Sequence, residues 1–142
     1  MDVTWYIIGG GELYETLSEQ IESKDMENYV QLLGEMGNPY PYIKHADVFV
    51  QPSRYEGRSV ILTEAKMLAK PILATRYATV GDQLTDGVNS ILVDMDAESI
   101  ADGIQRLAED SALQRRLCAA LRAEAAQSST VEHSYWKLFE LR

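Results

Sequence analysis

Two glutamates, Glu56 and Glu64, stand eight positions apart in the segment of this acidic chain where basic residues dominate. Gly57 permits a turn after the first glutamate, and Ser59 is placed to cap a helix that would carry the second. On that helix Glu64 would lie ~7.5 Å from the start, at ~1.5 Å per residue. Carboxylates so separated suit two hydroxyl-bearing groups of one elongated ligand, because a charged carboxylate accepts strong hydrogen bonds. The competing interpretation is an ordinary helix, with Glu64 paired to a nearby lysine and Glu56 exposed.

Positive charge is concentrated around the two glutamates. Five basic and two acidic residues lie between positions 54 and 76, a local balance of +3 within a chain of net charge -9. The basic residues are Arg54, Arg58, Lys66, Lys70 and Arg76. Such a cluster would steer a small anion to this segment, where the backbone N–H groups of residues 57 to 59 can surround it. A solvated helix face of mixed charge explains the composition equally well, so charge alone does not decide.

Short apolar runs alternate with helical patterns along the whole chain. The predicted strands cover residues 3–9, 28–34, 47–53, 71–75 and 90–94. The predicted helices cover residues 12–23, 59–69, 98–110, 112–127 and 131–142, with a short helical turn at 39–46. Strands that are nearly continuous in apolar or β-branched residues are typical of a parallel sheet covered on both faces. With 142 residues and no linker or repeat, we expect one α/β domain with helices on both faces of a parallel sheet.

Other candidate motifs favour structural roles. An open parallel sheet binds ligands beyond the carboxyl ends of its strands, where "GGGE" begins at Gly9. Tyr14 stands where the third glycine of a dinucleotide fingerprint would be, so a tight turn is the favoured interpretation. In "DMD", Asp96 is better placed to cap the next helix than to hold a metal. His45 and His133 lack partners at ligand spacing, which disfavours a metal site.

The composition excludes several classes of protein. A net charge of -9 and a pI near 4.6 argue against binding of nucleic acid, whose phosphates reward clustered Lys and Arg. The single cysteine, Cys118, lies in a helical pattern and is interpreted as a small buried apolar residue, as suits a reducing cytosol. The sequence has no apolar run of about 18 residues and no signal-peptide pattern, so we expect a soluble cytoplasmic chain.

The segment from residue 52 to residue 71 resembles the E-x7-E signature of retaining glycosyltransferases with the GT-B fold, of the group 1 (family 4) type. In that family the pattern P-S-x-x-E-G-x6-E-A-x4-G-x-P-V occurs in the C-terminal, donor-binding domain. The matching residues are Pro52, Ser53, Glu56, Gly57, Glu64, Ala65 and Pro71. Flanking stretches such as "WYIIGGGE" and "PILATRYATVGDQLTDGVNSILVD" follow the order of the same domain, so the resemblance covers essentially the whole chain. It is especially similar to bacterial enzymes that build capsular and lipopolysaccharide glycans.

The resemblance implies the Rossmann-like half of a GT-B fold and a nucleotide-diphosphate sugar as the donor, with no cofactor and no bound metal. Glu64 would bind the ribose hydroxyls, and Glu56 would contact the donor-sugar hydroxyls as the catalytic residue of the set. The loop whose backbone amides would meet the sugar and the phosphates is formed by Gly57, Arg58 and Ser59. A glycine loop near the phosphates would contain Gly10 and Gly11, and a loop against the base would run from Gly34 to Asn38.

Two departures from the family pattern affect these expectations. Ala69 replaces the usual glycine before x-Pro, a mild change that leaves the carboxylates alone. In the family, an Arg and a Lys that neutralise the diphosphate come from a strand and loop ahead of the residues matched here, and the acceptor domain also precedes them. We therefore expect a truncated donor domain that lacks its first strand and is inactive by itself, with a glycan or lipid-linked acceptor bound elsewhere in the intact enzyme. Arg54, Arg58 and Lys70 are the candidates to replace the missing charges.

Rival interpretations stay open. One is a catalytically inert binding module with weak nucleotide affinity, because its phosphate clamp is incomplete. A dinucleotide-dependent oxidoreductase is a second; Glu35 would end its second strand, but the glycine spacing does not fit. A sheet left with an unpaired strand would also favour self-association. The lipid-linked acceptors of the family imply that the intact enzyme works at the inner face of the membrane.

Overall fold

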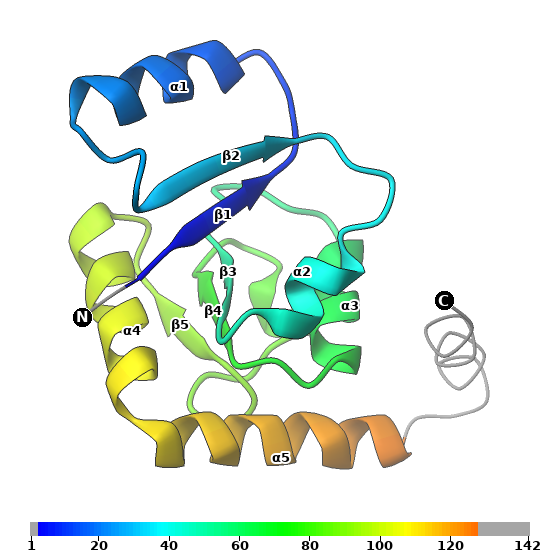
Figure 1. Ribbon diagram of the computed structural model, residues 1–142. Helices are drawn as coiled ribbons and strands as arrows, with labels where there is room; N and C mark the ends of the chain where they lie inside the picture. Colours follow the sequence, from blue (N-terminus) through cyan, green and yellow to red (C-terminus); the bar gives the residue numbers. More distant parts are fainter. Residues whose placement is uncertain (1–2, 128–142) are drawn as a thin grey trace. The chain divides into compact units, whose positions relative to one another are not determined.

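The structure, a computed structural model, describes residues 3–127 (Figure 1). The chain divides into two compact units, residues 1–41 and residues 42–142. No helix in the described part of the chain combines the length and the apolar character that crossing a bilayer requires. One nucleotide-sugar-binding domain across residues 1–142 stays a prediction.

The first unit contains two parallel strands joined by a helix. β1 (Trp5–Ile8) pairs with β2 (Val30–Gly34), and α1 (Tyr14–Ser23) connects them. Gly9 extends the pairing, because its N–H donates to the carbonyl of Gly34 at 2.8 Å. The two strands therefore end side by side, and the loops that follow them leave from the same edge.

The second unit contains a parallel sheet in the order β3-β4-β5. Its elements are α2 (Tyr40–His45), which begins at the boundary between the units, β3 (Phe49–Gln51), α3 (Val60–Met67), β4 (Ile72–Thr75), the 3-10 helix η1 (Val80–Asp82), β5 (Ile91–Val93), α4 (Ala97–Glu109) and α5 (Ser111–Gln127). Because the strands are parallel, their carboxyl ends share one edge of the sheet. The loops after β3, β4 and β5 gather at that edge.

Helices cover both faces of this sheet. Leu73 of β4 belongs to an apolar cluster with Leu107 of α4 and Leu117 of α5. Its neighbours Ile72 and Ala74 point to the opposite face and are also fully buried. In Figure 1, α3 lies on that side of the strands and α4 on the other. The prediction of an α/β fold, with parallel strands and helices on both faces, is confirmed.

Every strand and helix predicted within residues 3–127 is present, most of them shorter than predicted. The strand predicted at 47–53 ends at Gln51, because Pro52 has no N–H to continue the ladder. The helix predicted at 131–142 lies outside the described residues. Cys118 is only partly buried, which corrects the expectation of a buried thiol: the inward stripe of α5 consists of Leu113, Leu117 and Leu121.

Substitution of Gly103 by alanine is expected to lower the free energy of unfolding by about 1 kcal/mol. A Cβ at this position of α4 would clash with Leu73 Cδ1 and lie 3.0 Å from Val93 Cγ1. Overpacking costs about 1–3 kcal/mol, and the better helix propensity of alanine offsets up to about 1 kcal/mol. Urea unfolding measures the difference, with Asp102→Ala on the exposed side of α4 as the control. An unfolding free energy that is unchanged or raised in Gly103→Ala would contradict the expectation.

Candidate functional site

The loop between β3 and α3 holds the carboxylate of Glu56 in a defined orientation. Glu56 Oε1 accepts hydrogen bonds from Gln51 Nε2 at 3.0 Å and from Ser53 Oγ at 2.8 Å. Gln51 ends β3 and is buried, whereas Glu56 is partly exposed. The carboxylate is therefore oriented from behind by protein donors, and it retains lone pairs for a ligand.

The same glutamine connects this loop to the start of α3. Gln51 Nε2 also donates to Ser59 Oγ at 3.0 Å, and Ser59 Oγ accepts the N–H of Leu62 at 3.3 Å. The predicted N-cap at Ser59 is confirmed. Gln51 was not among the residues predicted from the sequence. A polar residue at the end of an apolar strand was nevertheless a visible signal, since a buried amide needs hydrogen-bond partners.

Two threonines fix the carbonyl groups of the loop. Thr79 Oγ1 donates to the carbonyls of Glu56, at 2.8 Å, and Gly57, at 3.1 Å. Thr75 Oγ1 donates to the carbonyl of Ser53. Both threonines come from β4 or the loop that follows it. These hydrogen bonds to the carbonyls of Ser53, Glu56 and Gly57 restrict how the peptide groups of the loop can rotate.

The three N–H groups predicted to surround a bound group differ in their surroundings. The N–H of Ser59 donates to Gln83 Oε1 at 2.9 Å. No residue of the described part of the chain accepts a hydrogen bond from the N–H of Gly57 or of Arg58. A Cβ at Gly57 would meet no other atom within 4 Å, so packing within the unit does not itself demand glycine there. Two backbone donors and open space thus lie beside Glu56.

Glu64 lies within α3 and is partly buried. It follows the N-cap Ser59 by five positions, as the sequence predicted. The neighbouring Lys66 forms an ion pair with Glu124 of α5 at 3.1 Å. The charge of Lys66 is therefore paired with Glu124, which is not one of the two motif glutamates.

Two more of the five basic residues are used to hold the fold. Lys70 Nζ donates to the carbonyl of Ala46 at 2.9 Å, ahead of β3 and at the opposite edge of the sheet from Glu56. Lys70 is thereby removed from the candidates to neutralise a diphosphate. Arg76 contacts Asp86, and burial, which alone would raise the pKa of Asp86, is outweighed by hydrogen bonds from the Leu92 N–H and from Arg76 that hold this pKa low.

Arg54 and Arg58 are exposed, and their side chains form no hydrogen bond or ion pair with another residue of the described part of the chain. Arg54 and Tyr55 line a depression of about 330 Å³ together with Ala78 and Met95. Tyr55 is 91% exposed. The depression lies where the loops after β3, β4 and β5 meet, which is the edge where open parallel sheets bind ligands.

Tyr77 lies beneath this edge with its side chain 2% exposed. Its hydroxyl has no hydrogen-bond partner among the described residues. Burial raises the pKa of Tyr77, and the negative charge of Glu56 raises it further. An unsatisfied buried hydroxyl of this kind costs free energy.

Replacement of Tyr77 by phenylalanine is expected to raise the free energy of unfolding by about 1 kcal/mol, because it removes a buried polar group that lacks a partner and keeps the ring. Thermal or urea unfolding of both proteins measures the change. Tyr55→Phe, on an exposed tyrosine, is the matched control and should leave the unfolding free energy unchanged. A less stable Tyr77→Phe would mean that the hydroxyl has a hydrogen-bond partner in solution.

The first unit contains the other predicted residues. Gly9 and Gly11 adopt φ values of 138° and 132°, which favour glycine, so the tight turn after β1 is present. Gly10 faces Glu35, whose Cγ would lie 2.9 Å from a Cβ at residue 10. Gly34, with φ of 68°, also has a glycine-favouring conformation.

Asn38 Oδ1 accepts the N–H of Tyr40 at 3.1 Å, at the start of α2. Gly10, Gly11 and Gly34 thus lie at the adjoining ends of β1 and β2, and Asn38 ends the loop that follows β2. Their contact with a nucleotide stays a prediction.

Asp96 caps α4, as predicted, because its Oδ1 accepts the N–H of Ser99 at 2.8 Å. Three or more His, Cys, Asp or Glu residues arranged to hold a metal ion are not found within residues 3–127.

The class of fold is defined by solved structures. HepE of Anabaena, in complex with UDP, matches with a TM-score of 0.82 and 22% identity over 98% of this chain and 40% of that one. A mutant of TarM of S. aureus, in complex with fondaparinux, alpha-GlcNAc-glycerol and UDP, matches with a TM-score of 0.80 and 25% identity over 98% of this chain and 29% of that one. The chain has the Rossmann-like α/β fold that forms half of a GT-B glycosyltransferase.

The family model described as "Glycosyl transferases group 1" matches residues 2–125, and the chain belongs to this family. The 2-deoxystreptamine N-acetyl-D-glucosaminyltransferase of Niallia circulans is 31% identical over 104 residues, which are 71% of this chain and 27% of that protein. The N-acetylgalactosamine-N,N'-diacetylbacillosaminyl-diphospho-undecaprenol 4-alpha-N-acetylgalactosaminyltransferase of Campylobacter jejuni is 30% identical over 116 residues, which are 80% of this chain and 32% of that protein. The chain therefore spans about a third or less of the length of these relatives.

Proposed function

We propose that this chain is the part of a retaining glycosyltransferase that binds a nucleotide-diphosphate sugar, from which the intact enzyme transfers a hexose to a glycan or a lipid-linked acceptor. The observation that carries the proposal is the oriented carboxylate of Glu56 beside the open N–H groups of Gly57 and Arg58. Membership of the glycosyl transferases group 1 family supports it. The UDP in the TarM complex supports the nucleotide, and the undecaprenol-linked acceptor named for the Campylobacter jejuni relative supports the acceptor class.

The proposed roles follow from the chemistry of each group. Glu64 accepts hydrogen bonds from the ribose hydroxyls, and Glu56 accepts them from the donor-sugar hydroxyls. As the acceptor hydroxyl oxygen forms its bond to the anomeric carbon and gives up its proton, the bond from that carbon to the diphosphate breaks. The diphosphate leaves with the electron pair and carries new negative charge. The positive end of α3 and the N–H groups of Gly57 and Arg58 stabilise that charge, so no metal ion is required.

The remaining predicted residues belong to the first unit. Gly10 and Gly11 would allow the backbone to approach the phosphates, and the loop from Gly34 to Asn38 would lie against the base. Ser59 contributes through its cap of α3 rather than through its N–H, which already donates to Gln83.

A second candidate function is an inert module with weak affinity for nucleotides. It is favoured by the use of Lys66, Lys70 and Arg76 in contacts within the chain, which leaves Arg54 and Arg58 as the cations of the segment that no described residue engages. Two such cations give less compensation for a diphosphate than the sequence alone suggested.

Calorimetric titration of this chain with UDP, GDP, ADP, UDP-glucose and GDP-mannose tests the two candidates. Binding of one nucleotide series supports the donor site and names the base. An absence of binding to every nucleotide, even at millimolar concentration, supports the inert module. Transfer by this chain alone is expected to be weak or undetectable, and robust turnover would contradict that expectation.

Self-association is proposed as well, because each sheet has end strands, β1 and β2 in one and β3 and β5 in the other, that pair with one neighbour only within the described residues. The other edge of such a strand presents backbone groups that a second chain can pair with. Light scattering at increasing concentration tests this, and a strict monomer at high concentration would exclude it.

A further inference from the structure

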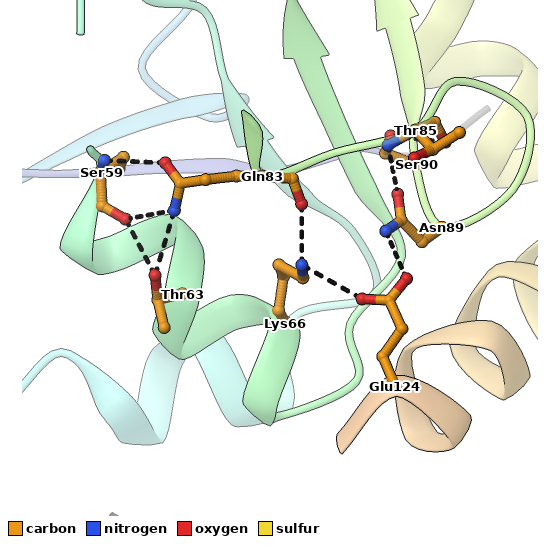
Figure 2. Close-up of polar contacts among 8 residues, drawn as sticks. All are labelled: Ser59, Thr63, Lys66, Gln83, Thr85, Asn89, Ser90 and Glu124. Carbon is orange, nitrogen blue, oxygen red and sulfur yellow. Dashed lines mark hydrogen bonds and ion pairs between the residues drawn. The ribbon is translucent and has the colours of Figure 1, made fainter. Parts of the chain in front are cut away.

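One buried glutamine, Gln83, forms hydrogen bonds with both backbone groups of Ser59, the N-cap residue of α3. Gln83 Oε1 accepts the N–H of Ser59 at 2.9 Å, and Gln83 Nε2 donates to the carbonyl of Ser59 at 3.0 Å and to Thr63 Oγ1 at 3.1 Å (Figure 2). Gln83 is 9% exposed and follows η1 in the loop after β4. Its side-chain amide therefore fixes both backbone groups of Ser59, the N-cap residue of α3.

Gln83 is itself held by Lys66 in the last turn of α3, and α5 supports that lysine. Lys66 Nζ donates to the carbonyl of Gln83 at 2.7 Å and pairs with Glu124 at 3.1 Å. Glu124 also accepts a hydrogen bond from Asn89 Nδ2 at 2.6 Å (Figure 2). A continuous polar chain thus runs from Glu124 of α5, through Lys66 of α3 and Gln83 in the loop after β4, to the start of α3.

This arrangement decides which backbone donors stay open at the candidate site. The N–H of Ser59 would be one of the unpaired donors that a helix N-terminus offers to an anion. Since Gln83 occupies it, the open donors among loop residues 57 to 59 are those of Gly57 and Arg58. A loop held at Ser59 by Gln83 and at Glu56 by Gln51 has little freedom to reorient either donor.

We propose that Gln83 is a positioning residue for the donor site: it holds the first turn of α3 so that the N–H groups of Gly57 and Arg58 meet the diphosphate, and the Lys66–Glu124 pair holds Gln83 in turn. The inference rests on the proposed function. Gln83 does not touch the ligand in this proposal, and it acts through Ser59.

The test compares Gln83→Leu with Gln114→Leu in the full chain. Leucine has a similar size and removes all three hydrogen bonds of the Gln83 side chain, while the backbone carbonyl that Lys66 contacts is kept. Gln114 is a matched control, because its Nε2 donates to the carbonyl of Leu107 at 2.7 Å in a partly buried place between α4 and α5. Both substitutions are expected to lower the melting temperature. Only Gln83→Leu is expected to weaken UDP binding, by about tenfold in calorimetry at a temperature where both variants are folded.

Amide hydrogen exchange supplies a readout that needs no ligand. The N–H groups of Ser59 and Leu62 should exchange slowly in the unsubstituted chain and in Gln114→Leu, and much faster in Gln83→Leu. If the exchange of these amides is unchanged in Gln83→Leu, or if both variants lose UDP affinity equally, the positioning role is wrong. If the unsubstituted chain binds no nucleotide while the exchange changes as expected, the proposed function fails and the hold of Gln83 on α3 stands.

Discussion

Replacement of Glu64 by alanine is expected to weaken nucleotide binding by about 1.5–3 kcal/mol, which is roughly a 10- to 150-fold rise in Kd. The proposed reason is the loss of a charged acceptor for the ribose hydroxyls, since hydrogen bonds to a charged group are stronger than neutral ones. Glu64 lies on the second turn of a capped helix, so its backbone position should survive the change. Calorimetric titration with the nucleotide that binds the unsubstituted chain measures the effect.

The control for this experiment is Glu109→Ala. Glu109 is an exposed glutamate in the last turn of α4, so its removal changes the net charge equally without touching the candidate site. Its Kd should stay within about twofold of the original value. Equal losses in both variants would assign the effect to general electrostatics and would contradict the ribose role of Glu64.

Replacement of Glu56 by alanine is expected to remove a different part of the binding energy. If Glu56 holds donor-sugar hydroxyls, Glu56→Ala should weaken the binding of a sugar nucleotide by about 1.5–3 kcal/mol. The affinity for the nucleotide diphosphate alone should change little. The two titrations together separate the contribution of the sugar to the binding free energy from that of the nucleotide. An equal loss of affinity for both ligands would rule out the proposal that Glu56 binds the sugar and Glu64 the ribose.

A conservative variant distinguishes the loss of the Glu56 charge from a change in the structure of the loop. Glu56→Gln retains an oxygen that can accept the hydrogen bonds of Gln51 and Ser53, but it loses the charge. It should bind sugar nucleotide with an affinity between those of the original chain and Glu56→Ala. Were Glu56→Gln as impaired as the alanine variant, the charge itself would be the essential property of Glu56.

The basic cluster of residues 54 to 76 is only partly available to a ligand, because three of its five members are engaged within the chain. The sequence predicted five cations available to steer an anion. The structure engages Lys66 with Glu124, Lys70 with the carbonyl of Ala46, and Arg76 with Asp86. A count of charge along the chain could not reveal this, because the partners come from distant positions.

The sequence alone predicts the parallel α/β fold, the glycosyltransferase family and the helix caps at Ser59 and Asp96, and each of these predictions is confirmed. These features depend on local signals: apolar runs predict strands, helical periodicity predicts the helices between them, and a cap is recognised within a few residues. The carboxylate pair of Glu56 and Glu64 was also visible from spacing, and its role in binding stays a prediction.

The contacts that hold the candidate site in place could not be predicted from the sequence, because they join residues that only folding brings together. Gln51 reaches Ser59 across eight positions, and Gln83 reaches it across 24, so no local pattern reports either contact. Such contacts form because a buried amide must find partners wherever the fold places them. The sequence therefore names the residues that can meet a ligand, while the packing of α3, η1 and α5 decides which of their N–H groups and charges stay open to it.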